Sequence, residues 1–160
     1  MTLRYAQMDS PLGPMVLATQ SDGLAGVWFV GQQHMPDMRD WQTGKHPVLT
    51  QTRQQLDEYF AGLRTRFDLP LRPAWGTEFQ KAVWQALRRI PEGQTTHYGA
   101  LAQELKRPLA SRAVGAAVGR NPWTIIVPCH RVVGANGALT GYAGGLERKV
   151  ALLQLEGLLL

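Results

Sequence analysis

The residues that could do chemistry gather in one short stretch, Pro128-Cys129-His130-Arg131. Cys129 is the only cysteine in the chain, and a thiol of ordinary pKa, about 8.5, is only a few per cent ionised at neutral pH. His130 could accept the thiol proton, and the guanidinium of Arg131 could hold the negative charge of the thiolate. A lone cysteine can also serve only to fill a core. The base and the cation beside it favour an activated nucleophile.

Apolar residues flank this stretch, with Ile125-Ile126-Val127 before it and Val132-Val133 after it. The pattern predicts a buried strand that ends at Pro128 and presents the thiol. Because adjacent side chains of a strand point to opposite faces, His130 would reach Cys129 only through a turn or a bridging water.

Pro128-Cys129-His130-Arg131-Val132 resembles the active-site signature of the O6-alkylguanine-DNA alkyltransferases, a family that repairs DNA by direct reversal. Further segments match the family's order and approximate spacing, namely Arg112-Ala113-Val114-Gly115, Asn121-Pro122, Gly141-Tyr142-Ala143-Gly144-Gly145 and Glu156-Gly157. The resemblance covers most of residues 76–160, whereas the first 75 residues match only loosely. It implies an α+β fold, with an RNase H-like α/β domain in residues 1–75 and a mainly helical, winged-helix-like domain in residues 76–160.

The chain of 160 residues is long enough for one domain or two small ones. A single cysteine allows no internal disulfide, which fits a reducing compartment. The sequence has no apolar run of transmembrane length and no signal-peptide core at its start. We therefore expect a cytoplasmic protein that does not enter a membrane.

The positive charge is unevenly distributed along the chain. Residues 1–75 hold seven Lys and Arg against seven Asp and Glu, while residues 76–160 hold ten against five. The whole net charge of +5 therefore lies in the C-terminal half. A biased, solvated surface is one explanation, and a polyanionic partner such as DNA is the other.

The N-terminal half reads as strands followed by a helix. Short apolar runs separated by turn residues predict strands at 3–8, 15–19 and 24–30, with a loop at 31–46, a helix from Pro47 to Phe60 and a further strand at 67–71. His34 and His46 are isolated from other metal-binding side chains, so we expect no metal site. This half is expected to support the other.

The C-terminal half reads as helical. After a linker at 72–76, Thr77 is expected to cap a helix in which apolar residues recur at helical spacing as far as Ile90. Helices at 98–105 and 110–119, joined by a short break, have the plan of a helix-turn-helix. A hairpin-type turn at 134–137, a loop at 140–145 and a final helix at 146–156 follow; the apolar set of that helix is Val150, Leu152, Leu153 and Leu155.

The second helix of that pair, at 110–119, is the element expected to bind DNA. It offers small side chains and one long cation, Arg112; the small residues are Ala110, Ser111, Ala113, Ala116 and Ala117. A helix that reads the major groove would present several long polar side chains, so the pattern favours the minor groove, where a side chain can unstack a base. The alkylated atom of an O6-alkylguanine lies inside the base stack, and the nucleotide must therefore be flipped out.

The resemblance assigns roles to individual residues. Arg112 would fill the gap left by the flipped nucleotide, with Ala110, Ser111, Tyr98 and Asn121 also on the DNA side. Tyr98 would help to rotate the 3′ phosphate and would protonate or hydrogen-bond the leaving guanine, and Asn121 would brace the turn before Cys129. The base pocket would be lined by Val127, Pro128, Tyr142, Ala143 and Gly144. Where Ala143 stands the family often has serine, so a side-chain hydrogen bond to the base oxygen is not expected here.

Glu156 is the last residue with an implied role. A carboxylate at the C-terminal end of a helix meets the unfavourable end of the helix dipole. The resemblance supplies a reason for it, since Glu156 would orient His130, which would activate Cys129 through a water.

The predicted reaction is one irreversible transfer of an alkyl group to Cys129, from O6-alkylguanine and also from O4-alkylthymine in double-stranded DNA. No cofactor is required, and we expect a monomer, with cooperative binding along DNA left open. No second thiol is present and no redox step restores an S-alkyl cysteine, so each molecule would act once.

Alternatives remain at this point. A cysteine hydrolase could use Cys129, His130 and Glu156 as a triad. A lesion sensor of the alkyltransferase-like class would bind without repair, although such proteins have tryptophan where Cys129 stands. A helix-turn-helix regulator would bind DNA with no chemistry at all.

Overall fold

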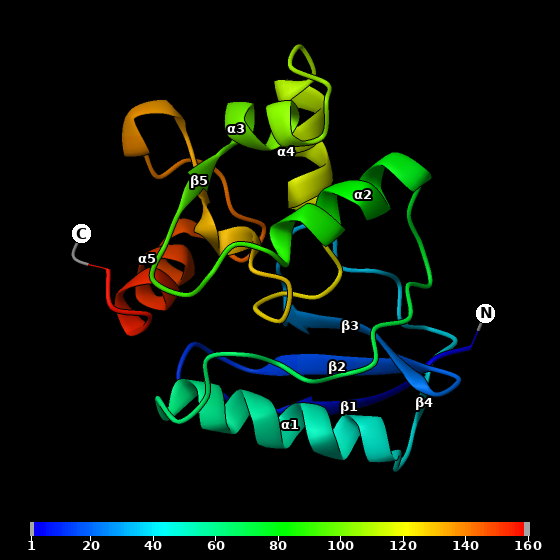
Figure 1. Ribbon diagram of the computed structural model, residues 1–160. Helices are drawn as coiled ribbons and strands as arrows, with labels where there is room; N and C mark the ends of the chain where they lie inside the picture. Colours follow the sequence, from blue (N-terminus) through cyan, green and yellow to red (C-terminus); the bar gives the residue numbers. More distant parts are fainter. Residues whose placement is uncertain (1, 159–160) are drawn as a thin grey trace. The chain divides into compact units, whose positions relative to one another are not determined.

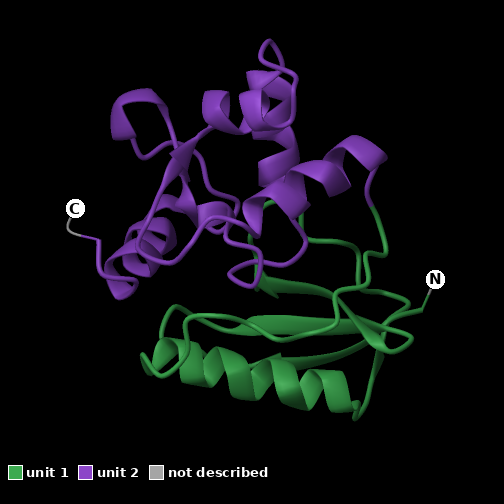
Figure 2. Cartoon of the chain, viewed as in Figure 1, with its two compact units in different colours: residues 1–75 green, residues 76–160 purple. Residues whose placement is uncertain are grey.

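The computed structural model describes residues 2–158, in which helices and strands are mixed as the α+β prediction requires (Figure 1). The chain divides into an N-terminal unit, residues 1–75, and a C-terminal unit, residues 76–160 (Figure 2). Met1, the first residue of the predicted N-terminal domain, and residues 159–160, the last of the predicted C-terminal domain, lie outside the described part. Within that part, no helix is long and apolar enough to span a membrane.

The N-terminal unit is built on a sheet of four strands: β1 (Arg4–Met8), β2 (Met15–Gln20), β3 (Gly23–Phe29) and β4 (Gln42–Thr43). Their order is β3-β2-β1-β4; β2 is antiparallel to both β3 and β1, whereas β4 is parallel to β1. The three longer strands confirm the prediction, whereas β4 was expected to be loop.

The predicted strand at 67–71 is wrong. Only an isolated bridge between Leu24 and Leu71 forms there. Leu24 donates its N–H to the carbonyl of Pro70, but Pro70 has no N–H of its own to extend a ladder.

Helix α1 (Pro47–Phe60) lies along the sheet in Figure 1 and begins and ends where the sequence predicts. Pro47 occupies the first turn, where its missing N–H costs nothing. His46 caps the helix, because its Nδ1 accepts from the N–H of Val48 at 3.0 Å while Nε2 contacts the carbonyl oxygen of Ser21 at 2.8 Å. The helix buries Val48, Leu49, Thr52, Leu56 and Tyr59.

The C-terminal unit consists mainly of four α-helices: α2 (Glu78–Leu87), α3 (Tyr98–Glu104), α4 (Ser111–Gly119) and α5 (Leu146–Leu155). Two short strands, β5 (Thr96–His97) and β6 (Val132–Val133), pair in parallel. Helices α3 and α4 pack together and are joined by a short turn, which confirms the predicted helix-turn-helix plan.

Helix α2 begins with a capping box. Thr77 accepts from the N–H of Gln80 at 3.1 Å, and the Gln80 side chain accepts from the N–H of Thr77 at 3.0 Å. The helix ends at Leu87, earlier than predicted, so that Ile90 is buried beyond its end. Trp84 ties α2 to α4, because its indole N–H donates to the carbonyl of Ala117 at 2.8 Å.

Two helix residues differ in burial from the prediction: Ala117 was expected to be exposed and Leu155 to be buried. Ala117 is buried where α4 faces α2, so it does not belong to the exposed set with Arg112, Ala113 and Ala116. Leu155, predicted to be in the apolar set of α5, is 41% exposed.

The predicted buried strand that ends at Pro128 is also wrong. Ile125 has a φ of +73°, Cys129–Arg131 form a 3₁₀ turn (η1), and only β6 is extended. Pro128 lacks the N–H that a ladder would need. The predicted hairpin-type turn at 134–137 is confirmed in its backbone, since Asn136 and Gly137 in η2 (Ala135–Gly137) both have the positive φ of such a turn, +63° and +76°. It does not join two paired strands, because β6 pairs with β5.

Replacing Thr77 by Ala should lower the free energy of unfolding by about 1 kcal/mol, because it removes one side of the capping box. Urea unfolding followed by circular dichroism measures the change. Thr95→Ala, an exposed change in the following loop, is the control and should stay within about 0.5 kcal/mol of the unmutated protein. Equal effects of the two substitutions would contradict the role of the cap.

Candidate active site

Cys129 begins the η1 turn and is only 7% exposed. Burial raises the pKa of its thiol, while a hydrogen bond from Asn121, the charge of Lys149 and a hydrogen bond from Tyr142 act in the opposite direction. The thiol therefore rests in its protonated form, among groups that stabilise the thiolate once it forms.

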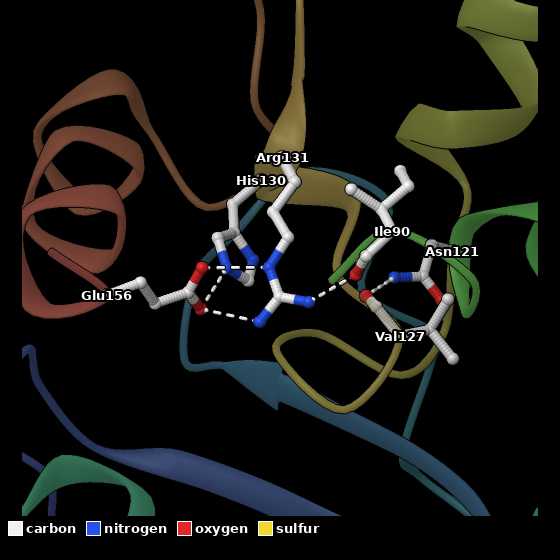
Figure 3. Close-up of polar contacts among 6 residues, drawn as sticks. All are labelled: Ile90, Asn121, Val127, His130, Arg131 and Glu156. Carbon is white, nitrogen blue, oxygen red and sulfur yellow. Dashed lines mark hydrogen bonds and ion pairs between the residues drawn. The ribbon is translucent and has the colours of Figure 1, made fainter. Parts of the chain in front are cut away.

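The turn before Cys129 is braced by the side chain of Asn121. Its amide donates to the carbonyl oxygens of Val127 at 2.9 Å and Trp123 at 3.2 Å, and its Oδ1 accepts from the N–H of Trp123 at 3.0 Å (Figure 3 shows the Val127 contact). Within this turn the β-branched Ile125 has a positive φ, a conformation that costs on the order of 1–3 kcal/mol. The bonds of Asn121 help to hold this conformation.

The carboxylate of Glu156 binds both of the residues that follow Cys129 in the chain, His130 and Arg131 (Figure 3). Its Oε2 lies 2.7 Å from Nε2 of His130, and Arg131 donates to Oε1 at 2.8 Å and to Oε2 at 3.0 Å. Arg131 also donates to the carbonyl of Ile90 at 2.6 Å. All three interacting side chains are buried.

These contacts correct one expectation. The guanidinium of Arg131 is directed at Glu156 and Ile90, so the prediction that it holds the thiolate charge is wrong. A buried carboxylate is a strong partner for a guanidinium, because the pair forms two parallel charge-assisted hydrogen bonds.

The contact with Glu156 determines which nitrogen of His130 carries the proton. A carboxylate can only accept, so Nε2 donates to it, which leaves Nδ1 with a lone pair. Nδ1 is buried and has no hydrogen-bond partner among the described residues. Burial lowers the pKa of His130, although Glu156 acts to raise it, so the ring is neutral at pH 7 and Nδ1 can accept a proton.

Two phenols lie near the sulfur. Tyr98, the first residue of α3, packs against α4, where a Cβ on Gly115 would be 3.6 Å from its ring. Burial raises the pKa of Tyr98, the thiolate of Cys129 raises it further, and a hydrogen bond with Thr140 lowers it. Tyr142 comes from the loop before α5 and can hydrogen-bond Cys129.

The structure thus brings Tyr98, Asn121 and Tyr142 to Cys129, and brings Glu156 to His130. Among the predicted pocket residues, Val127, Pro128 and Gly144 are buried and Ala143 is half-buried. Of the predicted DNA-side residues, Ala110, Ser111 and Arg112 form a separate group at the start of α4, where Arg112 is exposed and Ala110 is the N-cap. Within residues 2–158, no three His, Cys, Asp or Glu side chains are placed to hold a metal ion.

Lys149, which is buried in α5, was not among the site residues predicted from the sequence. Lys149, Leu152, Leu153 and Glu156 recur at the spacing of one helix face, and all four are buried. This pattern was the available signal, because a lysine on the apolar face of a helix needs a partner.

Comparison with known proteins gives the family. Residues 78–158 match the family described as "6-O-methylguanine DNA methyltransferase, DNA binding domain", and residues 3–73 match its "ribonuclease-like domain". The second match confirms the ribonuclease-like fold predicted for the N-terminal half.

Curated relatives named methylated-DNA–protein-cysteine methyltransferase agree with these matches. The protein of Methanosarcina acetivorans is 50% identical, over 96% of this chain and 97% of its own length. That of Mycobacterium leprae is 49% identical, over 93% of this chain and 89% of its own. A crystal structure described as Mycobacterium tuberculosis OGT in complex with DNA is 45% identical and superposes with a TM-score of 0.87, covering 98% of this chain and 92% of the other.

Replacing Glu156 by Gln should lower the free energy of unfolding by about 3 kcal/mol, because it leaves the guanidinium of Arg131 buried without a counter-charge. Urea unfolding measures the loss. Glu104→Gln is the matched control, since Glu104 also pairs with an arginine, Arg89, at 3.1 Å but in solvent. It should cost less than about 1 kcal/mol, and a similarly small loss for Glu156→Gln would contradict the network described here.

Proposed function

Because this chain belongs to the 6-O-methylguanine DNA methyltransferase family, we propose that the sulfur of Cys129 is the acceptor in its repair of alkylated DNA by alkyl transfer. The chain is a methylated-DNA–protein-cysteine methyltransferase in fold and in reaction class. The assignment of the acceptor is supported by the 2.7 Å contact between Glu156 and Nε2 of His130, which leaves an unprotonated Nδ1 on the residue that directly follows the only cysteine.

The reaction begins with a proton transfer. The thiol proton of Cys129 passes to Nδ1 of His130, through one water, and the carboxylate of Glu156 stabilises the imidazolium that forms. The sulfur then attacks the alkyl carbon, forming an S–C bond as the bond between that carbon and O6 breaks. The electron pair of the broken bond stays with the guanine.

The leaving guanine needs a proton or a hydrogen bond, and Tyr98 is the proposed donor. Its raised pKa keeps the phenol protonated at neutral pH, so that it can donate to the departing base. Hydrogen bonding to the charge that develops on the leaving group lowers the barrier to its departure.

The product is a thioether, which water does not cleave. Cys129 is the only cysteine, so no second thiol is available to resolve it, and thioethers lie outside the reversible oxidation chemistry of cysteine. Each molecule therefore acts once.

Helix α4 is proposed to bind double-stranded DNA from the minor groove. Its exposed Ala113 and Ala116 allow a close approach, and Arg112 is long enough to enter the stack where a nucleotide has been flipped out. The crystal structure of the Mycobacterium tuberculosis protein with DNA supports DNA as the partner. Residues Ala110, Ser111 and Tyr98 complete the proposed DNA side. Asn121, which was also expected there, is buried, and its amide is engaged by the turn before Cys129.

The remaining assignments follow from the same proposal. The loop that carries Tyr142, Ala143 and Gly144 would wall the base pocket together with Val127 and Pro128. O4-alkylthymine would be a second substrate, and the protein would act as a monomer in the cytoplasm. The N-terminal unit is assigned a supporting role.

Cys129→Ala should bind alkylated duplex DNA but transfer nothing, since it removes only the acceptor sulfur. Intact mass spectrometry after mixing with an O6-methylguanine oligonucleotide should show one methyl group on the unmutated protein, mapped to Cys129, and none on the variant. The exposed substitution Asp9→Asn, in the N-terminal unit, is the control and should be methylated normally. Methylation of Cys129→Ala, or several lesions repaired per molecule, would contradict the proposal.

Arg112→Ala should slow repair in duplex DNA by roughly 30-fold, because flipping a base costs a few kcal/mol that the arginine offsets. Reaction with free O6-benzylguanine, which needs no flipping, should change little. Arg120→Ala removes the same charge from the other end of α4 and is the matched control. Equal losses on both substrates for Arg112→Ala would exclude a role in flipping.

A further inference from the structure

We propose that Lys149 is a positioning residue for alkyl transfer. It fastens the loop at residues 140–145, called the pocket loop below, to strand β6, and it places a positive charge beside the sulfur of Cys129. The proposal rests on the function proposed above, because it takes Cys129 as the acceptor. It gives a role to a buried cation that the reaction scheme does not otherwise use.

The ammonium group of Lys149 is fully engaged by backbone carbonyls. Its Nζ donates to the carbonyl oxygens of Val132 at 2.6 Å, Thr140 at 2.9 Å and Gly141 at 3.2 Å. An ammonium has three N–H donors, so each has an acceptor. The residue is only 1% exposed, which means that water does not replace these bonds.

These bonds fix one end of the pocket loop. Gly141, with a φ of +43°, and Gly145, with a φ of +95°, have few steric limits of their own. Lys149 holds residues 140 and 141 to β6, while Arg148 donates to the carbonyl of Gly144 at 3.1 Å and holds the other end. Tyr142, which contacts Cys129, lies between these two attachments.

The charge of Lys149 has no carboxylate partner among the described residues. The one buried carboxylate nearby, Glu156, is occupied by His130 and Arg131. Burial lowers the pKa of Lys149 to about 8, which leaves most of the side chain protonated at pH 7, and interaction with the Cys129 thiolate raises that pKa.

The coupling to Cys129 is mutual, since Lys149 lowers the pKa of the thiol. Lys149 also lowers the pKa of the neighbouring imidazole of His130, so among these groups its charge favours a thiolate and a neutral histidine. Lys149 is therefore placed to supply the cation that the sequence suggested for Arg131.

The test uses the full chain and a small neutral electrophile, iodoacetamide. The rate of Cys129 alkylation is followed against pH by intact mass, and the midpoint of the profile reports the pKa of the thiol. Lys149→Met should raise the midpoint and slow the reaction at pH 7 by about tenfold, which corresponds to one pKa unit. Lys149→Arg, which keeps the charge, should restore a midpoint near that of the unmutated protein.

Arg148→Met is the matched control, since it removes the neighbouring cation and the other attachment of the loop. It should leave the midpoint where it is, although it alters the loop. A merely structural effect would move the midpoint equally in Arg148→Met and Lys149→Met, and that result would overturn the proposal. Lys149→Gln replaces Lys149→Met if the latter does not fold, and an unchanged midpoint in either variant also overturns it.

The attachment of the loop has its own readout. Free O6-benzylguanine must bind in the base pocket before it reacts, whereas iodoacetamide need not. Lys149→Met should therefore slow the reaction of Cys129 with O6-benzylguanine more than its reaction with iodoacetamide. Equal losses would overturn the claim that Lys149 positions the loop.

Failure of the proposed function would be distinguishable, because iodoacetamide alkylation needs no DNA. If the unmutated protein transferred no alkyl group from DNA, the proposed function would be refuted. If Lys149→Met still raised the iodoacetamide midpoint in that case, the effect of Lys149 on the thiol of Cys129 would stand.

Discussion

One buried carboxylate determines the arrangement of the reacting residues. Glu156 follows α5 and binds His130 and Arg131 together, two residues that lie more than twenty positions earlier in the chain. Removing a carboxylate and a guanidinium from water is costly, and only a complete set of hydrogen bonds offsets that cost. The set here is complete for both carboxylate oxygens, and through Arg131 it extends to the carbonyl of Ile90 after α2.

This network explains why the site can contain a reactive thiol without being reactive at rest. Burial keeps Cys129 protonated and keeps His130 neutral, and Glu156 fixes the proton of His130 on Nε2. In the proposed reaction the thiolate forms when the proton moves to Nδ1, and the charge of Lys149 favours that thiolate. Thiolates are oxidised far more readily than thiols, so the protonated resting state protects a sulfur that can be used only once.

Local signals were enough to predict much of the fold. Pro47 and an apolar face determine the start and the extent of α1, and the side chains of Thr77 and Gln80 determine the start of α2. The family signature around Cys129 led to the correct family, since its residue types and spacing are rare together. Glu156 could be singled out because its place at a helix end was unfavourable without a partner.

The predictions that were wrong or missing share a cause, since each depends on contacts between residues that are distant in sequence. The apolar run at 125–133 has the composition of a strand, but its path follows the bonds that Asn121 makes to the backbone of the turn. Arg131 lies next to Cys129 in sequence, yet its partner is Glu156. Lys149 stands on an apolar helix face, and its acceptors are carbonyls on β6 and the loop, which no local pattern reveals.

The contact with Glu156 holds His130 as the neutral tautomer with its proton on Nε2. Nitrogen NMR of the histidine side chains at pH 7, with the His130 signals assigned by comparison with His130→Gln, tests it most directly. We expect a protonated Nε2 and an unprotonated Nδ1 in the unmodified protein. A proton on Nδ1 with Nε2 free, or an imidazolium with both nitrogens protonated at rest, would contradict it.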